Sequence, residues 1–116
     1  IVLTGDTHEW WANELNDASG RPMGVELGTN AVTSPGASTY FGPEGATYSR
    51  LLRERNDMVT HHDPDGKGYI DLSPSREGAQ ATFVSVSNIL SQEYEVSNRA
   101  QFDLVRRDGS LRLRKT

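Results

Sequence analysis

The first eight residues place the strongest constraint on the fold of this chain. They begin with the continuous apolar run Ile-Val-Leu, which is typical of a strand that is buried on both faces. Gly5 ends the run, because glycine adopts backbone angles that larger residues resist. We therefore predict a central strand over residues 1–4, followed directly by a glycine turn.

The glycine turn carries two side chains of the kinds that bind metal ions. Asp6 and His8 are two residues apart, and in an extended chain this spacing places both side chains on the same side. A carboxylate oxygen and an imidazole nitrogen can then reach one metal ion. The alternative is that Asp6 caps the next turn or helix and that His8 is an ordinary polar neighbour.

The chain has few large apolar residues for its length. Its 116 residues suit one domain, and no stretch resembles a membrane span or a signal peptide. Isoleucine, valine, leucine and phenylalanine together account for only 24 residues, close to the proportion found in disordered chains. With so few, we expect the chain to bury its core well only with a partner. Because it begins directly inside an expected buried strand, we also expect it to be cut from something longer. Without cysteine, disulfides and thiolate metal sites are excluded.

Charge is distributed unevenly along the chain. Residues 99–116 carry a formal charge of +4, whereas residues 1–98 carry −8. Near the C-terminus, leucine and valine alternate with arginine, which predicts a two-faced hairpin with a solvated cationic side rather than a nucleic-acid surface. The Asp108-Gly109 pair predicts the turn of this hairpin. Strands are expected over residues 100–106 and 110–115.

The middle of the chain alternates strand patterns with one helical pattern. Trp11 and Leu15 stand at helical spacing, so we expect a short helix or turn over residues 9–17. Strands are expected over residues 23–33, 68–72 and 79–86, and a helix is expected over residues 48–55. Residues 37–45 are expected to run over the surface, where they can act as a lid.

Two polar motifs in the middle of the chain are not expected to bind metal. Asp63-Pro64-Asp65-Gly66 has the start of a calcium loop, but the position where such a loop needs a glutamate is Pro74, so the motif predicts a turn. His61 and His62 point to opposite faces if the chain is extended there, and therefore cannot face one metal ion.

Taken in order, these landmarks resemble one protein family. The first landmark is Gly5-Asp6-Thr7-His8, which lies within the segment Leu3–Leu15. It is followed by Val25-Glu26, Thr33-Ser34-Pro35-Gly36, Asn56 and Gly68-Tyr69-Ile70. Over most of residues 1–90 this succession resembles the C-terminal part of the alkaline phosphatase D (PhoD-like) metallophosphatases. The resemblance implies an α+β fold, the strand-rich C-terminal portion of a metallophosphatase-type β-sandwich with flanking helices. Residues 1–116 are then a single C-terminal fragment of a larger metallophosphatase domain, with a peripheral hairpin at about 100–116.

The resemblance also implies a function. In this family a Gly-Asp-x-His turn supplies ligands or near neighbours of a two-metal centre, which assigns Asp6 and His8 to the metal and His8 to catalysis. The parent protein is then a phosphomonoesterase or phosphodiesterase whose dinuclear centre holds divalent or trivalent ions such as Fe, Ca, Zn or Mn. Its implied partners are a phosphate ester substrate and the remaining N-terminal part of the same protein, with no nucleic acid and no membrane span. A secreted or periplasmic, bacterial-type location is also implied.

Parts of the family pattern are missing. Where the family commonly has Asn-Pro-His, this chain has Asn56-Asp57-Met58, so no histidine role carries over to Met58. The earlier metal motifs, the Asp-rich strand ends and the Gly-Asn-His-type turn, are absent from the sequence. We therefore expect the 116-residue chain alone to be inactive and to bind metal weakly or not at all.

Some roles are left open by the sequence. Trp10 and Trp11 either wall a substrate cleft or simply pack, and Glu26 is expected to brace the turn from a neighbouring strand. Two rival functions also stand. One is a small, mostly β binding or structural module with no catalytic role. The other is a regulatory or interaction fragment that docks another chain through residues 87–99 and the basic hairpin.

Overall fold

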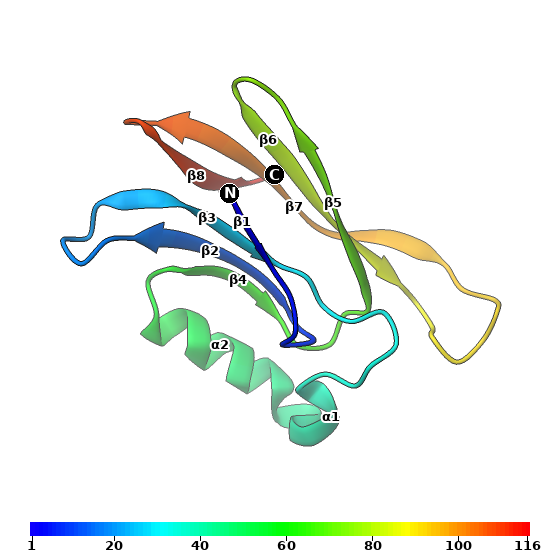
Figure 1. The fold of residues 1–116 in the computed structure, drawn as a ribbon. Helices are drawn as coiled ribbons and strands as arrows, with labels where there is room; N and C mark the ends of the chain where they lie inside the picture. Colours follow the sequence, from blue (N-terminus) through cyan, green and yellow to red (C-terminus); the bar gives the residue numbers. More distant parts are fainter.

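Two four-stranded β-sheets lie face to face in the computed structural model, which describes residues 1–116 (Figure 1). The first sheet has the order β1-β3-β2-β4, and comprises β1 (Val2–Thr4), β2 (Trp10–Asn16), β3 (Pro22–Gly28) and β4 (Val59–Asp63). The second has the order β5-β6-β7-β8, and comprises β5 (Gly68–Pro74), β6 (Gly78–Val86), β7 (Val96–Arg107) and β8 (Ser110–Lys115). We call them the first and the second sheet. The strand-rich α+β sandwich expected from the sequence is confirmed.

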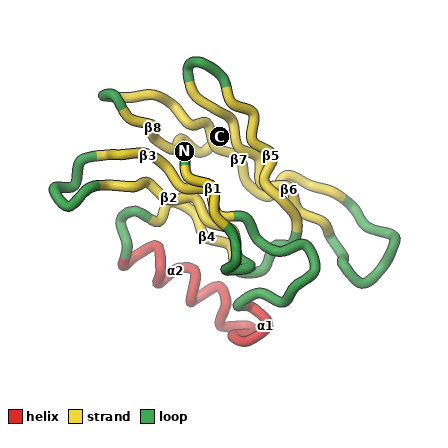
Figure 2. Tube along the Cα trace, in the orientation of Figure 1, coloured by secondary structure: helices red, strands yellow, loops and turns green.

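The helices cover one face of the first sheet. A short α1 (Ser38–Phe41) and the 3-10 turn η1 (Gly42–Glu44) lead directly into α2 (Gly45–Arg55). Figure 2 shows that α1 and α2 lie on the side of the first sheet that faces away from the second, and α2 packs against β4. The predicted helix is therefore confirmed and begins three residues earlier. The expected excursion over residues 37–45 is helical as well as largely exposed.

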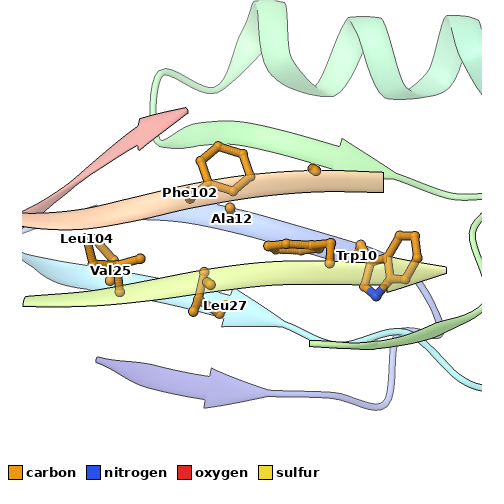
Figure 3. Close-up of a cluster of buried hydrophobic side chains, with 9 residues drawn as sticks. Trp10, Ala12, Val25, Leu27, Phe102 and Leu104 are labelled. Atoms are coloured by element: carbon orange, nitrogen blue, oxygen red, sulfur yellow. The ribbon is translucent and has the colours of Figure 1, made fainter. Parts of the chain in front are cut away.

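Apolar side chains from both sheets fill the space between them. In the first sheet, Trp10 and Ala12 alternate inward along β2, as do Val25 and Leu27 along β3 (Figure 3). The second sheet contributes five further buried side chains, from Ala81, Phe83, Ala100, Phe102 and Leu104. The strands expected over residues 79–86 and 100–106 are thus present as β6 and β7, and alternate residues of each face the core. The hairpin expected at the periphery supplies the edge strand β8, while β7 lies inside the sheet and carries part of the core.

Glu14 fastens the two sheets together at one end. Its Oε2 atom accepts a hydrogen bond from Nη1 of Arg112 at 2.7 Å, and its Oε1 atom accepts one from the backbone amide of Leu113 at 3.0 Å. Glu14 belongs to β2 and both donors belong to β8, so one carboxylate joins the two layers. A charged hydrogen bond of this kind is stronger than one between neutral groups.

The predicted central position of residues 1–4 is wrong within this chain. β1 pairs in parallel with β3 and lies at the edge of the first sheet. Its side chains are exposed, with Val2 at 47% and Leu3 at 63% of their maximum accessible surface. The apolar run indicated burial on both faces, but strand order is a tertiary property, and nothing in residues 1–116 covers the outer side of β1.

The predicted helix or turn over residues 9–17 is also wrong, because Trp10–Asn16 forms strand β2. This strand pairs antiparallel with β3 on one side and β4 on the other. Both ladders need an extended backbone, so sheet pairing overrides the local spacing of Trp11 and Leu15 that favoured a helix. β4 itself, with the sequence Val-Thr-His-His-Asp, carried too little apolar pattern to be identified as a strand.

Candidate functional site

The turn between β1 and β2 has an unusual backbone. Asp6 and His8 both have positive φ angles, of 74° and 59°, with Thr7 between them. Non-glycine residues rarely adopt this left-handed conformation, and it is concentrated where function demands a strained geometry. The expectation that Asp6 and His8 share a side because the chain is extended is therefore wrong. Turn geometry, rather than strand alternation, directs the two side chains.

The Asp6 carboxylate is free to receive a ligand. Its side chain is exposed and makes no hydrogen bond within the chain. The residues after it form a strand rather than a helix, so the alternative in which Asp6 caps a helix has no support.

The ring of His8 is held by one hydrogen bond to the backbone of another segment. Nδ1 of His8 lies 2.8 Å from the carbonyl oxygen of Pro35. A carbonyl oxygen only accepts, so Nδ1 must carry the hydrogen. In the neutral ring Nε2 is then left with a lone pair, and it makes no hydrogen bond within the chain and is not buried. This is the arrangement in which a histidine binds a metal ion through one nitrogen while the other is oriented by a carbonyl.

The two tryptophans after the turn have different roles. Trp10 is fully buried in the core, where its ring meets Phe83 edge to face, so packing is its role. Trp11 lies on the opposite face of β2, and its Nε1 atom donates a hydrogen bond to Oγ1 of Thr7 at 3.1 Å. The middle residue of the turn is thereby tied to the strand that follows it.

A buried acid–imidazole pair anchors the end of the turn. Oε2 of Glu9 lies 2.7 Å from Nε2 of His62, and the two side chains are only 5% and 0% exposed. The rings of Trp11 and Tyr48 pack on His62. Oγ of Ser49, in α2, donates to the carbonyl oxygen of His62. Sequence reasoning missed this pair, since the only signal was the position of Glu9 directly after the motif and its partner is 53 residues away.

The neighbouring histidine lies on the other face of β4, as predicted. The ring of His61 points between the sheets and contacts Phe83 and Phe102. Burial lowers the pKa of His61 to about 4, with Asp63 opposing the shift. His61 is therefore a neutral core residue, and it is separated from His62 by the sheet itself.

A loop segment, Ser34-Pro35-Gly36, presses against the turn, and we call it the strap. Besides the Pro35 carbonyl that meets His8, the strap offers the Ser34 carbonyl, which accepts a hydrogen bond from Nζ of Lys67 at 2.7 Å. Gly36 lies so near that a Cβ atom there would be 2.8 Å from the carbonyl oxygen of His8. Burial lowers the pKa of Lys67, and Asp65 opposes this.

Glu26 braces the strands beside the turn rather than the turn itself. Its two carboxylate oxygens accept hydrogen bonds from Oγ1 of Thr4 at 2.7 Å and from Nδ2 of Asn13 at 3.0 Å. Thr4 immediately precedes Gly5, so the brace fixes the position from which the turn starts. Glu26 therefore braces the turn only indirectly, through Thr4.

The Asp63 motif forms a turn, as predicted. Oδ1 of Asp63 accepts the amides of Asp65 and Gly66, and Oδ2 lies 2.7 Å from Nε of Arg99 in the second sheet. Although burial acts to raise the pKa of Asp63, these hydrogen bonds and the charge of Arg99 outweigh it and hold the pKa below its ordinary value. Both carboxylate oxygens of Asp63 thus accept hydrogen bonds within the chain.

The chain places no complete set of metal ligands around one point. No group of three or more His, Cys, Asp or Glu side chains is placed to hold one metal ion. Met58, where the family pattern would offer a histidine, lies at the opposite end of β4 from Asp63, and its carbonyl oxygen accepts the amide of Glu14. It is therefore remote from the turn that carries Asp6 and His8.

The largest surface hollow lies elsewhere. It measures about 800 Å³ and is lined by residues of the second sheet, including Arg76, Asp103 and Arg114. The guanidinium group of Arg114 is already paired with Asp103 at 2.7 Å. This hollow is open to solvent, and one of its arginines is already paired, so the turn remains the better candidate site.

Comparison with known proteins identifies the chain's relatives. The family model described as PhoD-like phosphatase matches residues 1–83, which include the turn, the strap and Lys67. The chain belongs to the PhoD-like phosphatase family. A solved structure titled "Structure of PhoD" superposes with a TM-score of 0.75 at 22% sequence identity, and covers 97% of this chain. At that identity the likeness shows the fold alone. No curated protein matches the sequence.

This PhoD-like chain corresponds to a small part of its structural relative. It spans 21% of the length of the PhoD structure that it matches. The family match ends within β6, whereas the structural match extends through β7 and β8 as well. No helix of this PhoD-like chain is long and apolar enough to cross a membrane.

Proposed function

We propose that the PhoD-like protein containing this chain hydrolyses phosphate monoesters or diesters at a dinuclear metal centre, and that Asp6 and His8 are two of the metal ligands. The observation that carries the proposal is the state of His8. Its Nδ1 atom is committed to the Pro35 carbonyl, while Nε2 keeps a lone pair and no partner within the chain.

The residues present fit part of such a centre. Asp6 offers unbonded carboxylate oxygens, and His8 offers one oriented nitrogen, which suits metals that accept mixed oxygen and nitrogen ligands. Both lie in a left-handed turn that is held by Trp11, Glu9 and Pro35. A rigid turn keeps the two ligands in place before the metal arrives.

The bound metal ions would supply an activated water and neutralise the charge that develops on the phosphoryl oxygens. Within this chain, Asp6 contributes negative charge and His8 contributes a neutral nitrogen ligand. The further ligands and the substrate contacts are then contributed by other parts of the same protein, as the small share of the PhoD structure that the chain covers suggests. The identity of the metal and an exported location stay predictions.

The rival docking function has less support. Of the basic residues in the hairpin, Arg112 pairs with Glu14 and Arg114 pairs with Asp103. Two of the positive charges that suggested a docking surface are therefore neutralised by carboxylates of the same chain.

Substitution of the two proposed ligands tests the function. In the complete protein, Asp6→Asn and His8→Ala should each lower the rate of phosphate ester hydrolysis by about 100-fold or more, because water activation and charge stabilisation are lost together. The assay is release of a chromogenic phenol from a phosphomonoester and a phosphodiester, with bound metal measured in parallel. Asp57→Asn, an exposed aspartate just before Met58, serves as the control and should leave the rate unchanged. Turnover near that of the wild type in both ligand variants would rule out the assignment.

A further inference from the structure

A chain of contacts runs from Lys67 to the ring of His8. Nζ of Lys67 donates to the carbonyl oxygen of Ser34 at 2.7 Å, and the next carbonyl, that of Pro35, lies 2.8 Å from Nδ1 of His8. Two consecutive carbonyl groups of the strap are therefore engaged at once. One is fixed by a cation and the other fixes the histidine.

The backbone of Lys67 is itself held by a hydrogen bond to the second sheet. Its own carbonyl oxygen accepts a hydrogen bond from the amide of Val86 in β6 at 2.8 Å. The preceding residues are held by the capped turn of Asp63, which bonds to the amides of Asp65 and Gly66. The ammonium group of Lys67 forms no salt bridge, so its hydrogen bond is directed to the strap rather than to a carboxylate. Hydrogen bonds from β6 and from the Asp63 turn thus hold the backbone from which Lys67 reaches the strap.

Gly36 allows the strap to lie this close. A Cβ atom at position 36 would stand 2.8 Å from the carbonyl oxygen of His8 and 3.1 Å from that of Pro64. Both are backbone atoms and cannot rotate away. Any larger residue at position 36 must therefore push the strap off the turn.

We propose that Lys67 is a positioning residue for His8, acting through the Ser34-Pro35-Gly36 strap to keep the hydrogen on Nδ1 and the lone pair on Nε2. The significance of this tautomer for metal binding rests on the proposed function. The tautomer itself does not, because it follows from contacts within the chain. Without the cation, the strap loses one of its two anchors, and the Pro35 carbonyl no longer holds the ring in one orientation.

The test reads the tautomer of His8 directly. The protein is labelled with 15N-histidine and studied metal-free by NMR at about pH 8.5, where an imidazole is ordinarily neutral. The chain has only three histidines, and a His8→Gln variant assigns the signals of His8. The wild type should show nitrogen shifts of a single Nδ1–H tautomer. Lys67→Met, which keeps the length but removes the charge, should show a mixture of both tautomers.

Three further variants separate positioning from general stability. Lys67→Arg keeps a cationic donor and should retain the wild-type pattern. Lys115→Met removes the other lysine of the chain, which is exposed in β8, and should change nothing at His8. Gly36→Ala displaces the strap with Lys67 intact, and should give the same mixture as Lys67→Met. It decides the question if Lys67→Met does not fold.

The inference is overturned if His8 carries its hydrogen on Nε2 in the wild type, or if either Lys67→Met or Gly36→Ala folds and keeps the wild-type pattern. Neither result depends on metal or on turnover. If Asp6 and His8 prove not to be metal ligands, this inference about the tautomer is unaffected. If the inference about Lys67 fails, the ligand assignment is likewise unaffected.

Discussion

The backbone of Gly66 lies directly against the ring of Trp10, the largest side chain in the core. A Cβ atom at position 66 would overlap atoms of that ring, which is fully buried and has no free space to rotate into. We predict that Gly66→Ala destabilises the chain by about 2 kcal/mol or more, since overpacking forces both side chain and backbone to shift. Urea unfolding monitored by tryptophan fluorescence measures the change.

Gly24→Ala is the matched control for that substitution. Gly24 lies in β3, and a Cβ atom there would meet no atom within 4 Å. The control should therefore change the free energy of unfolding by less than about 1 kcal/mol, in either direction. Equal destabilisation by the two alanines would show that Gly66 is not limited by the Trp10 ring.

His61 predicts a pH dependence of stability. Its pKa is about 4 in the folded chain, mainly because burial disfavours the charged ring, against an ordinary value of 6.5. The unfolded chain therefore binds a proton more readily, and stability present above pH 6.5 is lost as the pH falls toward 4. The loss should reach at most about 3 kcal/mol. His61→Leu should remove this part of the pH dependence.

The measurement compares urea unfolding of the wild type and of His61→Leu between pH 7 and pH 4. Subtracting the two profiles gives the contribution of His61 together with its interaction with Asp63, because the carboxylates that do not interact with His61 contribute equally to both. Parallel profiles over this range would mean that the ring is protonated inside the fold at little cost.

At the level of elements, the sequence predicted those strands whose own residues alternate. β6 and the β7–β8 hairpin carry regular inward and outward positions, and Asp108-Gly109 forms the turn with positive φ at both residues. β2 was missed because Trp11 and Leu15 imitate a helical period. β4 was missed because two histidines stand where apolar residues would mark a strand. In both strands, pairing with distant segments decides the conformation.

The contacts of the candidate site were predictable only in part. The motif itself drew attention to Asp6 and His8, since residue types and spacing are local information. The partners that hold the turn are separated from it by long stretches of chain, as with Glu9 and His62 or His8 and Pro35. A single sequence holds no signal that links such residues. The strained φ angles likewise arise from the connection between two sheet positions rather than from the residues alone.

The β1 element predicts self-association of the 116-residue chain. One side of β1 has no pairing strand, and Leu3 is 63% exposed. An open apolar edge favours pairing with another chain, whereas a charged side chain there opposes it. We expect the wild-type chain to associate as its concentration rises and Leu3→Lys to stay monomeric. Sedimentation velocity over a concentration series measures this.

Leu90→Lys is the control for the edge substitution. Leu90 is 93% exposed, but it lies in the loop between β6 and β7 and not on a strand edge. Its substitution by lysine adds the same charge and should leave the association unchanged. A wild-type chain that remains monomeric at every concentration would contradict the prediction.

For the whole molecule, we predict that residues 1–116 alone bind divalent metal weakly and do not turn over phosphate esters. The proposed ligands Asp6 and His8 would supply only two metal contacts, whereas a catalytic dinuclear centre needs several more. An ion held by two ligands keeps most of its water and lacks a fixed geometry. Calorimetric titration with Mn²⁺, Zn²⁺ and Ca²⁺, together with a chromogenic phosphodiester assay, measures both properties. The complete protein is the positive control, and tight stoichiometric binding with metal-dependent turnover by the chain alone would contradict the prediction.

The carboxylate of Glu14 has one more consequence for the molecule as a whole. The amide of Leu113 points out of the edge strand β8 and is covered by Glu14 of the opposite sheet, not by a neighbouring strand. Its hydrogen is therefore shielded from solvent only while the two layers remain in contact. Deuterium uptake at this single amide reports how often the sandwich opens between its layers, separately from fraying within either one.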